Sequence, residues 1–111
     1  MLSIRFFPKN KPWHDEVEVD APYQVVGDYL TSDVQHDPEG AQKLIATFKQ
    51  IIRGERELFE DEGNAYLVEV NASAARISTE YGTKPSCELP TAWLIDALEQ
   101  WVAYLEGRRT T

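Results

Sequence analysis

The stretch that most constrains the fold is HDPEGAQKLIATFKQIIRG, residues 36–54. Asp37 suits an N-cap, Pro38 suits the first helical position and Gly54 suits the residue that follows a helix. Between them, apolar residues recur at the spacing of one helical face. These residues are Ala41, Leu44, Ile45, Phe48, Ile51 and Ile52. The pattern predicts an amphipathic helix that must bury one side against another element.

A second apolar stripe predicts a helix over residues 91–109, TAWLIDALEQWVAYLEGRR. Its members are Leu94, Leu98, Trp101, Val102 and Leu105. The pattern in residues 23–34, YQVVGDYLTSDV, is mixed. Four apolar side chains could share a helical face, but Gly27 interrupts them, and the β-branched and aromatic content favours a strand. We interpret this segment as a strand or as irregular structure.

Four further stretches have the composition of β-strands: residues 2–7, 16–20, 65–70 and 74–81. The last two are joined by a short polar connection and predict a hairpin. In residues 16–20, EVEVD, the alternation directs two valines to one face and three acids to the other. The order of these elements predicts a single-domain α+β fold with a largely antiparallel sheet and two amphipathic helices packed on one face.

Charge is unevenly distributed along this chain of 111 residues, whose net charge is -8 at pH 7. Residues 15–39 contain eight acids and no Lys or Arg, whereas residues 1–14 contain three bases and no acids. This balance disfavours nucleic acid and anionic membranes as partners, because Lys and Arg bind both. A basic protein is the complementary partner. No signal peptide or membrane span is evident, so we expect a cytoplasmic protein.

The candidate binding surface consists of acidic side chains and one tyrosine. In an extended strand, the acids of residues 16–20 would form a row with spacings of about 6 to 7 Å. A second acidic cluster, FEDEGN at residues 59–64, is expected in an exposed turn. The predicted partner-binding residues are Asp15, Glu16, Glu18, Asp20, Tyr23, Asp28, Asp33, Glu60, Asp61 and Glu62. The alternative is that the acids only solubilise a strand edge and oppose aggregation.

No residue pattern indicates catalysis, a metal site or a cofactor. The acids of an extended strand lie along a line, whereas Ca²⁺ needs oxygen atoms that converge on one point. Cys87 is the single cysteine and lacks a nucleophile motif, while His14 and His36 neighbour carboxylates without a catalytic pattern. We therefore expect a protein that is not an enzyme and that needs neither metal nor cofactor.

Short motifs over residues 20–107 resemble the YacL-like small bacterial proteins. The matching residues are Val25, Val26 and Gly27, then Gly54 and Glu55, then Gly63, Asn64 and Tyr66. That family implies no catalytic residues. In size and acidity the chain is also similar to the immunity proteins of contact-dependent growth inhibition systems, whose partners are often basic nucleases. This second resemblance implies a protein that neutralises a bacterial toxin. The alternative is a housekeeping protein, homodimeric through a sheet edge or the aromatic helix.

Overall fold

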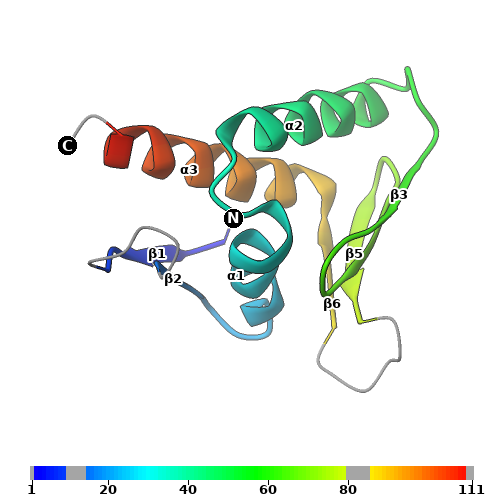
Figure 1. The fold of residues 1–111 in the computed structure, drawn as a ribbon. Helices are drawn as coiled ribbons and strands as arrows, with labels where there is room; N and C mark the ends of the chain where they lie inside the picture. The colour runs from blue at the N-terminus through cyan, green and yellow to red at the C-terminus, as the bar shows by residue number, and fades with distance from the viewer. Residues whose placement is uncertain (1, 10–14, 80–85, 110–111) are drawn as a thin grey trace.

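The protein has two separate β-sheets, with a short helix between them and two longer helices lying side by side above (Figure 1). The computed structural model describes residues 2–9, 15–79 and 86–109. The helical elements are α1 (Gln24–Tyr29), the π-helical turn η2 (Leu30–Val34), α2 (Pro38–Ile52) and α3 (Thr91–Arg109). The strands are β1 (Ile4–Phe7), β2 (Glu16–Val19), β3 (Phe59–Glu62), β4 (Leu67–Val70), β5 (Ala74–Ser78) and β6 (Cys87–Pro90). The α+β class is confirmed, but the strands form a two-stranded and a four-stranded sheet rather than one.

Helices α2 and α3 lie side by side and supply the centre of the core (Figure 1). The predicted start and end of α2 are confirmed: Asp37 Oδ1 accepts a hydrogen bond from Gly40 N at 3.0 Å, and Gly54 has a φ of +78°. Phe48 and Trp101 are fully buried. The predicted stripe of α3 is buried throughout, whereas that of α2 ends one residue early, because Ile52 is 45% exposed.

Residues 24–34 form a helix, so the prediction of a strand or irregular structure was wrong. The four apolar side chains do share one buried face, as a helix requires: Val25, Val26, Tyr29 and Leu30. Gly27 does not interrupt this helix. A Cβ atom at this position would lie 2.7 Å from the carbonyl oxygen of Val17 in β2. Glycine is therefore needed for the close approach of α1 to β2.

The four-stranded sheet is antiparallel, with strand order β3-β4-β5-β6. The predicted hairpin is confirmed as β4 and β5, and Asn71 Oδ1 accepts hydrogen bonds from Ser73 N and Ala74 N in its turn. Residues 59–62 were expected in a turn but form edge strand β3, which pairs with β4 and packs Phe59 against Phe48 with ring centroids 5.3 Å apart. One face of the sheet is buried under the helices, and residues on the other face are exposed or half-buried.

The two-stranded sheet is an antiparallel pair of β1 and β2 below the C-terminal half of α3 in Figure 1. As predicted from the EVEVD alternation, Val17 and Val19 face the core and the acids face outward. No described helix combines the length and the apolar content that a bilayer span requires. The prediction concerning His14 lies outside the described residues, as do the last two residues of the strand predicted over 74–81.

Candidate protein-binding surface

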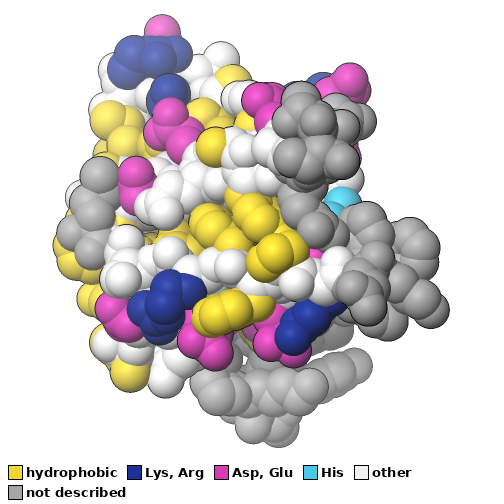
Figure 2. Space-filling model, turned by 90° about the vertical axis from the view of Figure 1, so that its left-hand side faces the viewer, with side chains coloured by type: hydrophobic (Ala, Val, Ile, Leu, Met, Phe, Trp, Pro, Cys, Tyr) yellow, Lys and Arg dark blue, Asp and Glu magenta, His cyan; other side chains and the backbone are white. Residues whose placement is uncertain are grey.

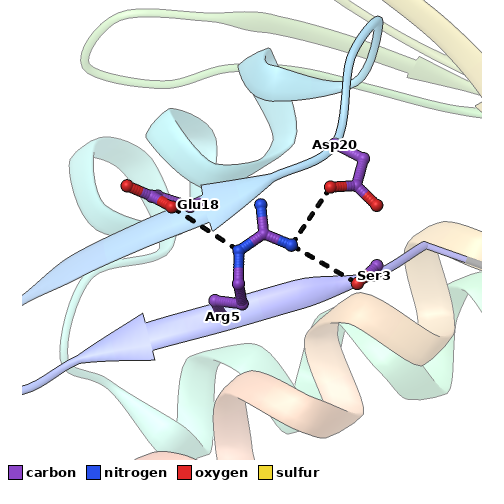
Figure 3. A network of polar contacts seen from close by, with 4 residues as sticks. All are labelled: Ser3, Arg5, Glu18 and Asp20. Atoms are coloured by element: carbon purple, nitrogen blue, oxygen red, sulfur yellow. Dashed lines mark hydrogen bonds and ion pairs between the residues drawn. The ribbon is translucent and has the colours of Figure 1, made fainter.

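The predicted acidic row on β2 lies on the exposed face of the β1–β2 pair, beside two basic side chains. Arg5 contacts Glu18 and Asp20, with nitrogen–oxygen distances of 3.5 and 3.1 Å (Figure 3). Lys9 Nζ lies 3.6 Å from Glu16. Figure 2 shows this end of the molecule, where dark blue and magenta side chains lie together around a hydrophobic centre. Arg5 and Lys9 therefore meet the following acids in the fold.

Asp15 was predicted to join this exposed row, and that prediction was wrong. Its side chain has no exposed surface. Its carboxylate accepts hydrogen bonds from the backbone N–H of Lys9 at 3.0 Å and from the hydroxyl of Tyr104 at 2.6 Å, and Nε2 of His36 lies 3.7 Å away. Because a buried carboxylate requires hydrogen-bond donors, Asp15 fastens the β1–β2 pair to α3 rather than meeting a partner.

Asp28 and Asp33 also have partners within the protein. Asp33 accepts hydrogen bonds from the backbone N–H groups of Ala65 and Tyr66, at 2.9 and 3.1 Å, and Asp28 accepts one from the Tyr66 hydroxyl. Burial, together with this bond to Asp28, raises the pKa of Tyr66. These carboxylates fix the β3–β4 connection against α1 and η2. Tyr23 is half-buried and packs edge-on against Trp93, with ring centroids 5.7 Å apart.

The predicted acids Glu60, Asp61 and Glu62 all lie exposed on edge strand β3. They do not share one face, because side chains alternate along a strand. Asp61 shares the inner side of the sheet with its cross-strand partner Val68. Burial first, then the carboxylates of Asp33 and Asp61, raise the pKa of Tyr29. Glu60 and Glu62 are directed to the outer face.

The outer face carries three charged residues that were not predicted as part of the site: Glu69, Arg76 and Glu88. Strand register aligns Glu60 with Glu69, Glu69 with Arg76, and Arg76 with Glu88, so four charged residues cross the sheet in one row. In the described part of the chain, no ion pair involves any of them. In both LVEV and CELP a glutamate stands between apolar residues, and this sequence signal could have identified both glutamates as outward-facing.

A shallow hollow of about 280 Å³ lies along this row. Its lining residues are Leu58, Phe59, Glu60, Glu69, Val70, Asn71, Ala74, Arg76 and Glu88. One end is apolar, since Leu58 is 53% exposed and Val70 and Ala74 also contribute. The remainder carries three carboxylates and one guanidinium. The hollow therefore presents negative charge beside a small apolar surface.

The described residues show little that resembles a reactive centre. Burial raises the pKa of the Cys87 thiol to about 11, so at neutral pH this residue is a thiol and a poor nucleophile. In the described ranges of the chain, no group of three or more His, Cys, Asp or Glu side chains could hold a metal ion.

Comparison with known proteins gave no match among family models, curated proteins or solved structures.

Proposed function

We propose that the protein binds and neutralises a basic protein partner, and that the outer face of the β3–β6 sheet is its docking surface. The partner class we favour is a basic toxin domain, which would make this chain an immunity protein. One observation carries the proposal: the exposed sheet face holds Glu60, Glu62, Glu69 and Glu88 against the single base Arg76, with no ion pair among them in the described structure.

Carboxylates without a counter-ion create a field that attracts a basic surface and speeds association. The β1–β2 pair contributes less to this field, because Arg5 and Lys9 offset its acids. A toxin that acts on nucleic acid needs clustered Lys and Arg to bind phosphates, and an acidic sheet face is suited to covering such a cluster. Self-association through β3 is disfavoured by the same charges, since two copies would bring their acidic edges together.

Two charge-matched variants test this proposal. The outer-face variant carries Glu62→Gln, Glu69→Gln and Glu88→Gln. The β2 variant carries Glu16→Gln, Glu18→Gln and Asp20→Asn. Each variant is co-expressed with the product of the adjacent open reading frame, and association with the purified partner is followed by stopped flow at low and high salt. We expect the outer-face variant to associate several-fold more slowly and with a flatter salt dependence.

The β2 variant should associate almost as fast as wild type, because Arg5 and Lys9 already offset the acids that it removes. Equal slowing by both variants would mean that net charge alone governs the encounter. A larger decrease in association rate for the β2 variant would place the docking surface on β2. Failure of the wild-type chain to bind that product or to protect cells from it would contradict the toxin proposal.

A further inference from the structure

We infer that the outer-face hollow receives one arginine side chain of the partner, held between Glu60 and Glu69 with its aliphatic stem over Leu58. This inference rests on the proposed function and assigns the contact at its centre. It begins from the strand register: Glu60 and Glu69 are direct cross-strand partners on the outer face, where Glu60 is exposed and Glu69 is half-buried. Like charges placed directly opposite each other destabilise a sheet.

Neither Glu60 nor Glu69 forms an ion pair within the described structure. Arg76 is the only base in the outer-face row, and its position opposite Glu69 also places it opposite Glu88. No ion pair or side-chain hydrogen bond joins Arg76 to either glutamate. Glutamates at any exposed positions would make the protein soluble. Solubility therefore does not explain why Glu60 and Glu69 lie directly opposite each other on neighbouring strands. Sites where a sequence departs from such local rules are often functional.

The shape and composition of the hollow favour one side chain as its occupant. Its volume of about 280 Å³ is enough for one long side chain. Its apolar end at Leu58 adjoins the opposed carboxylates. Long basic side chains place an apolar stem on such a surface while the charged head remains in a polar environment. Arginine is favoured over lysine, because its planar fork can contact two carboxylates at once.

The test compares stability with binding in single-charge variants. The probe is N-acetyl-arginine amide, titrated into ¹⁵N-labelled protein and followed by amide chemical shifts, with N-acetyl-lysine amide as the second probe. Glu60→Gln removes one member of the opposed pair, and Glu18→Gln removes the same formal charge from the pair with Arg5. Leu58→Ala shortens the apolar end of the hollow and leaves the charge unchanged.

We expect the arginine probe to shift the amides of residues 58–60 and 69 in wild type, more strongly than the lysine probe does. Glu60→Gln should raise the urea midpoint and lower the affinity for the arginine probe at least about fivefold. Glu18→Gln should leave that affinity unchanged. Leu58→Ala should also weaken the probe. The opposite signs for stability and binding would not arise from a merely solubilising charge.

Equal weakening by Glu60→Gln and Glu18→Gln, or shifts spread over the whole acidic surface, would overturn the anchor. So would a lower urea midpoint for Glu60→Gln, since the two carboxylates would then not oppose each other. The docking face and the arginine anchor can fail separately. Slower association of the outer-face variant with the partner supports the docking face, whereas an unchanged dissociation rate of the Glu60→Gln complex contradicts the arginine anchor. If both results were found, the docking face would be retained and the anchor rejected.

Discussion

The β1–β2 pair and the outer face of the β3–β6 sheet are both acidic, but they differ in what lies opposite each acid. On the pair, register places Arg5 opposite Glu18, and Lys9 reaches Glu16. On the sheet, register places Glu60 opposite Glu69. The denser run of acids in the sequence therefore forms the better balanced surface. Cross-strand register decides which carboxylates lie beside a counter-ion, and acid density along the chain does not.

The two regions also differ in how they are attached to the core. The β1–β2 pair is fastened by polar and close-packed contacts, through the buried Asp15 and the approach of β2 to Gly27. The four-stranded sheet is fastened by its apolar inner face and by the contact of Phe59 with Phe48. Substitutions in the apolar attachment are therefore expected to have the largest effects on stability, and those in the exposed charge pairs the smallest.

The largest effect is expected from Phe48→Ala, in the apolar attachment of the sheet. Phe48 is fully buried, so its truncation should lower the free energy of unfolding by about 3 to 5 kcal/mol. Urea unfolding followed by tryptophan fluorescence and by far-UV circular dichroism measures this loss. Both signals should change together, since Trp101 lies in the same core.

The control for Phe48→Ala is Phe7→Ala, a phenylalanine of β1 that is 39% exposed. It should cost less than about 1 kcal/mol. Coincident urea midpoints for wild type and Phe48→Ala would show that α2 is not packed as described. Two separate transitions would show that the β1–β2 pair and the sheet do not share one core.

An intermediate effect is expected from Asp15→Asn, in the polar attachment of the β1–β2 pair. The asparagine oxygen can accept from Lys9 N–H while its amide group donates to the Tyr104 oxygen, so two hydrogen bonds to a buried carboxylate become weaker, neutral ones. The substitution should lower the free energy of unfolding by about 1 to 3 kcal/mol. Asp20→Asn, an exposed member of the same acidic region, should change it far less. Equal urea midpoints for the two variants would contradict the anchoring role of Asp15.

The sequence could predict the elements that carry local signals, and it missed those whose conformation depends on tertiary contacts. Helices α2 and α3 and the β4–β5 hairpin carry local signals, such as a cap, an apolar stripe and a turn, and were predicted. Helix α1 was missed because Gly27 serves a tertiary contact with Val17, which no local pattern reveals. Strand β3 was missed because its acidic composition resembles a turn, and pairing with β4 determines its conformation.

The candidate site was predicted only in part, for a related reason. Asp15 and Asp33 looked exposed because hydrophilic residues usually are, but Asp15 is buried, Asp33 is half-buried, and their hydrogen-bond donors lie far away in the sequence. Asp28 is exposed as expected, yet it accepts a hydrogen bond from the distant Tyr66 hydroxyl. The outward direction of Glu69 and Glu88 could have been read from strand alternation. The opposition of Glu60 and Glu69 required the register between β3 and β4, which the sequence does not specify when one strand is unrecognised.

The smallest effect on stability is expected from Arg5→Gln, which removes the balance between acids and bases on the β1–β2 pair. Arg5 contacts Glu18 and Asp20 in exposed ion pairs, so their loss should change the free energy of unfolding by less than about 1 kcal/mol. Binding should change more than stability, because both carboxylates lose their counter-ion. Titration with N-acetyl-arginine amide should shift amides of residues 16–20 in this variant and leave them nearly unchanged in wild type.

Arg76→Gln is the matched control for Arg5→Gln, since it removes the same charge from the outer sheet face. It should strengthen probe binding at residues 60, 69 and 88 without exposing a new site on β2, because Arg76 lies between Glu69 and Glu88. Higher salt should weaken the added binding in both variants. If the wild-type β1–β2 pair already binds the probe as strongly as the sheet does, Arg5 and Lys9 do not offset its acids. Cross-strand pairing would then not be what separates the two acidic surfaces.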